Sequence, residues 1–156
     1  MQLDFPRPRN SAYHAPRGPM HSVDILFPMF GLVLLTFSVL IQIPIRRFRA
    51  AYLGQVTVED FRLGESANVP EPTSLPNRNY MNLLELPLLF YVLCLSLYVT
   101  DRADSTSCLL AWIYVGLRVV HSAIHVTYNH VIQRLVVFAI SNFLLAGCWL
   151  RFFLQL

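Results

Sequence analysis

Polar side chains recur at helical spacing within two otherwise apolar stretches of the sequence. In the first stretch, Arg78, Asn82 and Glu85 are four and three residues apart, so they share one face of a helix. The second stretch has a similar pattern, at offsets of four, three and four residues, in Tyr114, Arg118, His121 and His125. Arginine binds carboxylates in a bidentate manner, and a glutamate can bind an ammonium group. With Arg134 nearby, the two patterns predict a site for an anionic ligand that also forms hydrogen bonds.

The histidines of the second pattern, His121 and His125, allow a different interpretation. Two imidazoles four residues apart on a helix can bind a metal or a haem, which would give the purified protein bound metal or visible absorbance. The surrounding arginines and the single carboxylate of Glu85 disfavour a cation. We therefore expect no metal at this site.

The composition excludes an ordinary soluble domain. Of the 156 residues, 55% are hydrophobic and 13% are charged, and the mean hydropathy is +0.49, whereas roughly a quarter of the residues of a soluble domain are charged. All 12 basic residues are arginine, so there is no lysine for a water-exposed surface. The net charge is +3, but no dense basic run, glycine-rich phosphate loop or CxxC pair accompanies it, so no nucleic-acid partner is expected.

The chain divides into an arm and a membrane domain. Residues 1–22 contain four prolines and three arginines without an apolar core, which predicts a mostly disordered arm. Residues 23–156 contain four apolar segments, at about residues 23–45, 79–99, 108–126 and 134–156. A helix of about 23 residues is roughly 34 Å long, which exceeds the ~30 Å core of a bilayer. The first segment is expected to end at Pro44 and the arginines that follow it. We therefore predict an all-α, antiparallel four-helix bundle in a lipid bilayer.

The distribution of arginines predicts how this bundle is oriented. Four spans place both ends of the domain on one side of the membrane. Six arginines flank the spans on the side of the first and third loops, against four on the opposite side. The positive-inside rule therefore predicts that the long first loop is cytoplasmic, in a bacterial inner membrane or a membrane of the endoplasmic reticulum type.

Ionised side chains inside a membrane bundle need a physical reason, because each costs about 2.5–3.5 kcal/mol at mid-bilayer even on insertion scales. One alternative is that Glu85 and Arg118 form a buried ion pair that only fixes the register of two helices. A single structural pair has no use, however, for Arg78, Asn82 and the histidines near the same membrane edge. These additional polar groups favour a ligand site.

Several segments carry longer motifs. The string RNYMNLLELPLLFY at residues 78–91 contains the arginine, asparagine and glutamate of the first pattern. GLRVVHSAIH at residues 116–125 is followed by Arg134 in NHVIQRLVVF, and PIRRFRAAY at residues 44–52 is a basic helix end. Over about residues 23–156, these motifs resemble the MAPEG family, the membrane-associated proteins in eicosanoid and glutathione metabolism.

The resemblance implies an assembly and an activity. The assembly is a homotrimer of four-helix protomers, with glutathione bound in clefts between neighbouring subunits near the cytoplasmic face. The activity is that of a glutathione transferase or peroxidase acting on a lipophilic small molecule that arrives from the bilayer. Glutathione would be a co-substrate, and a guanidinium beside its sulfur would favour the reactive thiolate.

The resemblance also implies roles for individual residues. Arg134 would stabilise the thiolate, and Arg47, at the end of the first helix, would help to orient the thiol, so both would be catalytic. Together with the polar patterns, the family's motifs predict seven glutathione-binding residues: Arg46, Arg78, Asn82, Glu85, Arg118, His121 and His125. Family members commonly have tyrosine at the two histidine positions.

A non-enzymatic protein of the same fold is the main alternative. Such a protein would bind a lipid or serve as an assembly partner, and its polar side chains would only hold the trimer together. Substitution of Glu85 or Arg118 would then disrupt assembly, and there would be no turnover to lose.

Overall fold

The computed structural model describes residues 22–156, and every regular element in this range is helical. In chain order the elements are η1 (Ser22–Ile25), α1 (Leu26–Tyr52), η2 (Val58–Phe61), α2 (Glu71–Leu84), α3 (Pro87–Val99), α4 (Ser105–Val126) and α5 (Val131–Gln155). The predicted arm at residues 1–22 lies, apart from Ser22, outside the described residues. The prediction of an all-α fold is confirmed.

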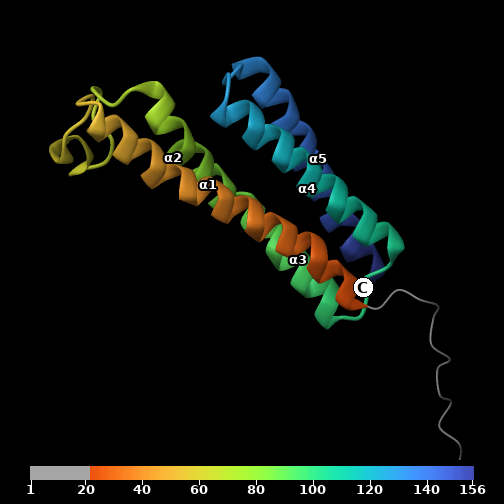
Figure 1. The fold of residues 1–156 in the computed structure, drawn as a ribbon. Coiled ribbons are helices and arrows are strands. Elements are labelled where there is room, and N and C mark those ends of the chain that lie inside the picture. Colours follow the sequence, from red (N-terminus) through yellow and green to blue (C-terminus); the bar gives the residue numbers. More distant parts are fainter. Residues whose placement is uncertain (1–21) are drawn as a thin grey trace, which may run out of the picture.

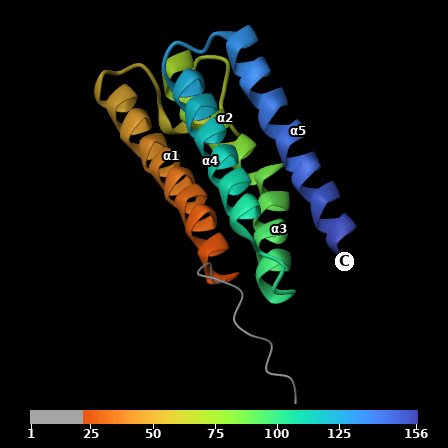
Figure 2. The same ribbon diagram turned by 90° about the vertical axis from the view of Figure 1, so that its right-hand side faces the viewer.

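Four helical segments in the described part of the chain are long and apolar enough to cross a membrane. They are Ser22–Tyr52, Glu71–Val99, Ser105–Val126 and Val131–Gln155. Successive segments run in opposite directions, and the helices lie side by side along a common axis (Figures 1 and 2). The predicted four-helix membrane bundle is therefore confirmed, and the protein is a multi-pass membrane protein.

The first helix is longer than the sequence predicts. The sequence predicts an end at Pro44, but α1 continues to Tyr52 with Pro44 in its interior. A proline removes one backbone hydrogen bond from a helix. The turn beyond it is held by Arg46, whose guanidinium donates to the carbonyl oxygens of Pro72 (2.7 Å) and Val126 (2.9 Å). Side-chain contacts with α2 and α4 thus extend the helix past the proline.

The second membrane segment begins earlier than predicted and is broken in the middle. α2 begins at Glu71, with Pro72 in its first turn, where a missing N–H loses no helical partner. α2 ends at Leu84, and Glu85 leaves the helical conformation with φ −81° and ψ −102°. α3 begins at Pro87, which cannot donate a backbone hydrogen bond and would clash with the preceding turn of a continuous helix. The break places Glu85 at an interruption of the span.

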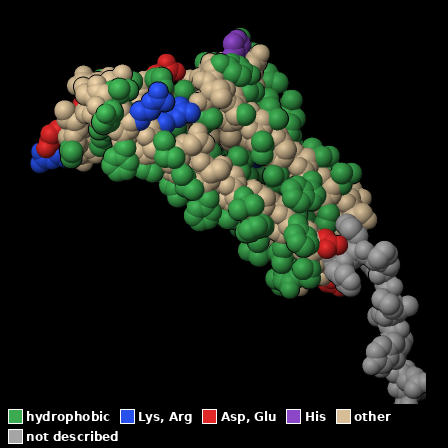
Figure 3. Space-filling model, viewed as in Figure 1, with side chains coloured by type: hydrophobic (Ala, Val, Ile, Leu, Met, Phe, Trp, Pro, Cys, Tyr) green, Lys and Arg blue, Asp and Glu red, His purple; other side chains and the backbone are tan. Residues whose placement is uncertain are grey.

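The apolar core lies between the helices, and other apolar side chains face outward. Leu32 of α1, Leu83 of α2, Phe90 of α3 and Tyr114 of α4 are at most 2% exposed. The rings of Phe90 and Tyr114 stack with their centroids 4.6 Å apart. On the face shown in Figure 3, hydrophobic side chains extend along the length of the bundle, and charged side chains lie mainly toward its ends. Such a surface suits contact with lipid.

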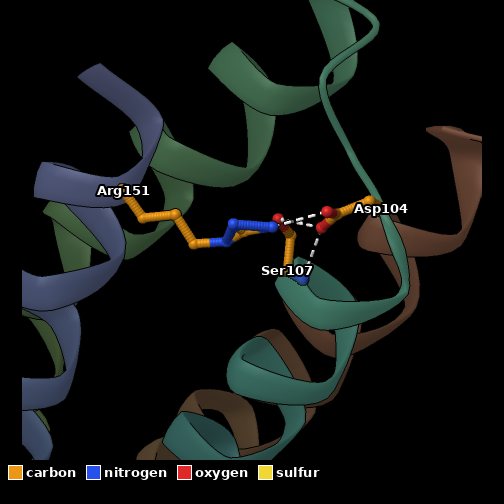
Figure 4. A network of polar contacts seen from close by, with 3 residues as sticks. All are labelled: Asp104, Ser107 and Arg151. Atoms are coloured by element: carbon orange, nitrogen blue, oxygen red, sulfur yellow. Dashed lines mark hydrogen bonds and ion pairs between the residues drawn. The ribbon is translucent and has the colours of Figure 1, made fainter. Parts of the chain in front are cut away.

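A polar network ties α5 to the start of α4 (Figure 4). Asp104 precedes α4 and accepts hydrogen bonds from the backbone N–H (2.8 Å) and the hydroxyl (2.7 Å) of Ser107. Its other carboxylate oxygen pairs with the guanidinium of Arg151 on α5. Partial burial alone would raise the pKa of Asp104, but the hydrogen bonds from Ser107 and the interaction with Arg151 together lower it. The network closes the end of the bundle opposite the α1–α2 loop.

Candidate functional site

A polar cleft opens between α2, α4 and α5 and has a volume of about 320 Å³. Six polar or charged residues line it, and all six belong to the predicted site: Arg78, Asn82, Glu85, His121, His125 and Arg134. The apolar residues of the lining are Met81, Val131, Leu135 and Phe138. The sequence did not single out these four, because nothing in an apolar helix marks which side chains will face a cleft. The cleft thus joins a charged wall to an apolar one.

The polar face of α2 follows from helical spacing and from the break that ends the helix. Arg78 and Asn82 are one turn apart, and Glu85 is the residue that follows the last turn of α2. Arg78 and Glu85 carry opposite charges. Both are exposed, so both lie at the open side of the cleft. A guanidinium and a carboxylate that line the same cleft can bind a carboxylate and an ammonium of one zwitterionic ligand.

Arg118 lies behind the cleft and binds Asn82. The Arg118 side chain is fully buried, and its Nη2 donates to the side-chain oxygen of Asn82 at 2.5 Å and to the backbone oxygen of the same residue at 3.2 Å. Glu85 is not its partner: the ion pairs among residues 22–156 are Arg47–Glu65, Arg62–Glu59 and Arg151–Asp104. The alternative of a buried Glu85–Arg118 pair is therefore wrong. The physical reason is burial, because Arg118 points into the bundle whereas Glu85 is exposed.

The two histidines form a buried pair on α4. His121 and His125 are 2% and 6% exposed, and their ring centroids are 5.7 Å apart at an interplanar angle of 89°. Nδ1 of His121 is 3.2 Å from the backbone oxygen of Arg134. Nε2 of His121 and both ring nitrogens of His125 are buried without a hydrogen-bond partner among the described residues. These orphaned nitrogens can bind a polar ligand in the cleft. Residues 22–156 contain no group of three or more His, Cys, Asp or Glu side chains placed to hold a metal ion.

Arg134 is positioned by the turn between α4 and α5. Its Nη1 donates to the side-chain oxygen of Asn129 at 2.5 Å, and the amide nitrogen of Asn129 donates to Glu71 at 2.9 Å. Asn129 has φ +49°, in the left-handed region that asparagine tolerates better than most residues. Sequence reasoning did not identify Asn129 or Glu71. The Tyr-Asn-His sequence before α5 is a turn signal that marks such an asparagine.

The basic pair at the end of α1 lies outside the cleft of its own protomer. Arg46 binds the carbonyl oxygens that hold α1 to α2 and α4. Arg47 forms an ion pair with Glu65 of the α1–α2 loop at 2.9 Å, and its guanidinium lies 4.6 Å from the ring centroid of Phe61. Neither arginine lines the cleft. Six of the nine predicted site residues thus line the cleft. Arg118 lies behind it and binds Asn82, whereas Arg46 and Arg47 do not line it.

These features define a class of protein: a multi-pass helical membrane protein with a basic, half-apolar cleft near one end of the bundle. The comparison with protein families agrees with this class. A model of the MAPEG family matches residues 25–154, which is most of the chain, and the protein therefore belongs to the MAPEG family. No curated protein and no solved structure matches the chain.

Proposed function

We infer that the cleft binds glutathione and that the protein uses the bound thiol to attack a lipophilic electrophile, as a transferase or a peroxidase. The observation that carries this proposal is the convergence of Arg78, Glu85 and Arg134 on one cleft, from α2 and α5. Membership of a family named for glutathione metabolism supports it.

The charges of the cleft complement those of the tripeptide. Glutathione carries two carboxylates and one amine. Arg78 provides a guanidinium for a carboxylate, Glu85 provides the carboxylate for the ammonium, and Arg134 provides a guanidinium for the thiolate. Asn82 and the two histidines supply neutral hydrogen-bonding groups between them. The charged residues of the cleft therefore match one carboxylate, the ammonium and the thiolate of glutathione.

Arg134 favours the reactive form of the thiol. An unperturbed thiol has a pKa near 8.5, so only a few per cent is thiolate at neutral pH. A guanidinium beside the sulfur stabilises the thiolate, and each unit by which the thiol's pKa falls corresponds to about 1.4 kcal/mol of preferential binding. Arg134 is suited to this role because the turn holds its guanidinium in place through Asn129.

The apolar wall of the cleft is the proposed route for the electrophile. Met81, Val131 and Leu135 line the cleft and are 52%, 61% and 61% exposed. A side chain that lines the cleft and also faces outward connects it to the surrounding lipid. A lipophilic molecule can therefore enter from the bilayer and meet the thiolate beside the charged wall.

The proposed assembly is a homotrimer in which a neighbouring subunit bounds each cleft. Arg46 and Arg47 belong to this part of the proposal. Both are engaged within their own protomer, by backbone oxygens and by Glu65, so a role at the ligand requires that they act across a subunit boundary. Cross-linking of the protein in native membranes measures the number of subunits.

The proposed function is tested by titrating the detergent-purified protein with glutathione. Calorimetry measures binding, and ultraviolet absorbance measures the thiolate. We expect saturable binding in the millimolar range or tighter, and conjugation of an aryl halide at a rate above that of the buffer. Arg78→Gln should weaken binding, and Arg102→Gln, at the opposite end of the bundle, is the matched control. A folded protein that does not bind millimolar glutathione would exclude the proposal and favour the non-enzymatic alternative.

A further inference from the structure

His121 has an arrangement that ligand binding alone does not require. The ring lines the cleft and is 2% exposed. Nδ1 is 3.2 Å from the backbone oxygen of Arg134, and Nε2 is buried without a partner among the described residues. One nitrogen of the ring is therefore held by the protein, and the other has unused hydrogen-bonding capacity in a residue that lines the cleft.

The contact with the backbone of Arg134 determines which nitrogen of His121 carries the proton. A carbonyl oxygen can only accept a hydrogen bond, so Nδ1 is the donor. In a neutral imidazole the other nitrogen, Nε2, then has an unshared electron pair. A histidine that is oriented through one nitrogen and has the other unpaired is the usual arrangement of a general base.

We propose that His121 is the general base and general acid of the reaction, a role that rests on the proposed glutathione function. The S–H bond of bound glutathione breaks, and its proton moves to Nε2 of His121. The thiolate sulfur then forms a bond to the β-carbon of an electrophilic alkene conjugated to a carbonyl group. The electron pair of the double bond moves toward the carbonyl, and the α-carbon takes the proton from Nε2. The addition has no leaving group, and the histidine ends the cycle neutral.

The charged and titratable groups around His121 leave it as the best placed base. The groups that surround it are Arg78 of α2, Glu85 directly after α2, Arg118 and His125 of α4, and Arg134 of α5. Arginine remains protonated and cannot accept a proton. Glu85 is exposed and is the proposed partner of the ammonium group. Within residues 22–156, no hydrogen bond holds either nitrogen of His125, so these residues do not set its tautomer.

Proton counting on the unmodified protein tests the role of His121 directly. The protein is mixed with glutathione near neutral pH in a weak buffer that contains a pH indicator, and thiolate absorbance is recorded together with proton release. S-methylglutathione, which has no thiol, corrects for protons from other groups. If Nε2 takes the thiol proton, thiolate forms with almost no release of protons. Release of one proton per thiolate would overturn the proposal, because the proton would then have gone to solvent.

The variant His121→Asn provides a second test. The asparagine amide can still donate to the Arg134 carbonyl, but it cannot take up a proton. With glutathione at saturating concentration, we expect the rate of addition to trans-4-phenyl-3-buten-2-one at neutral pH to fall by about 100-fold. The remaining rate should rise with pH as the thiol ionises unaided, and added imidazole should restore part of it. His130→Asn is the matched control, because His130 caps α5 outside the cleft and asparagine is also a good cap.

The results distinguish the two proposals. If the wild-type protein binds glutathione and His121→Asn keeps both its rate and its pH profile, the role of His121 is wrong and the proposed function stands. If the wild-type protein does not bind glutathione, the proposed function fails, and the role of His121 fails with it.

Discussion

The guanidinium of Arg118 is hydrogen-bonded inside the bundle to Asn82. Nη2 of Arg118 lies 2.5 Å from the side-chain oxygen of Asn82 and 3.2 Å from its backbone oxygen. Nε and Nη1 of the same guanidinium have no partner among residues 22–156. An ionised group in an apolar interior is costly unless it is hydrogen-bonded. Asn82 therefore supports the fold as well as lining the cleft.

Asn82→Ala should destabilise the protein, because it removes the side-chain acceptor of a buried guanidinium. We expect the free energy of unfolding to fall by about 3 kcal/mol, as measured by thermal or denaturant unfolding in detergent. Asn77→Ala on the same helix is the control and should change stability by less than about 0.5 kcal/mol. Equal stability of the two variants would mean that Arg118 does not depend on Asn82.

Removing both partners should be less harmful than removing one. In Asn82→Leu combined with Arg118→Leu, no charged group is left unpaired in the interior, so part of the lost stability should return. Unfolding of the double variant beside both single variants measures this coupling. A double variant that is as unstable as the sum of the two single changes would contradict the pairing.

Arg134→Gln should reduce turnover without disturbing assembly. Glutamine carries no charge to stabilise a thiolate, so loss of one unit of pKa depression lowers the thiolate population by about tenfold. The fraction of bound glutathione that is thiolate at neutral pH measures this change, and size measurements in detergent report on assembly. Arg62→Gln is the control, because Arg62 is an exposed loop residue whose pair with Glu59 is 3.6 Å long. An unchanged thiolate population in Arg134→Gln would remove Arg134 from the chemistry.

Asp104 should make stability depend on pH in the acid range. Its carboxyl has a lower pKa in the folded protein than in the unfolded chain, because of Ser107 and Arg151. The stability that it contributes is therefore present above about pH 4 and is lost as the pH falls through the folded pKa. Asp104→Asn keeps a cap for α4 but loses the ion pair, so at neutral pH it should cost less than about 1 kcal/mol. The difference from wild type in thermal unfolding should shrink as the pH falls below about 4, and a constant difference would contradict this account.

Asp60 should hold the α1–α2 loop in its folded form. Its carboxylate accepts hydrogen bonds from the backbone N–H of Thr57 (2.8 Å) and from the hydroxyls of Thr57 (2.9 Å) and Ser66 (2.6 Å). These bonds, with the one from Ser66 the largest, lower the pKa of Asp60 to about 2. Asp60→Ala should expose the loop to proteases and to hydrogen exchange, while glutathione binding is unchanged. Glu59→Ala is the control, and equal protection of the loop in both variants would contradict the role of Asp60.

Much of the architecture and part of the site could be predicted from the sequence. The apolar runs predict the four spans because a helix rises about 1.5 Å per residue, so length alone shows that a run can cross a bilayer. The spacing of Arg78, Asn82 and Glu85 predicts a shared face for the same local reason. Helix ends were less predictable. α1 continues beyond Pro44 because Arg46 donates hydrogen bonds to carbonyl oxygens of α2 and α4, and both helices are far from Arg46 in the sequence.

Only the tertiary structure decided which polar groups meet. Arg118 binds Asn82 and not Glu85, Arg47 binds Glu65, and His121 meets the backbone of Arg134. Periodicity along one helix determines which side chains share a face, because each residue advances the helix by a constant rotation. The partner of a long side chain depends instead on how distant helices pack and on where a helix breaks, and neither is contained in the local pattern.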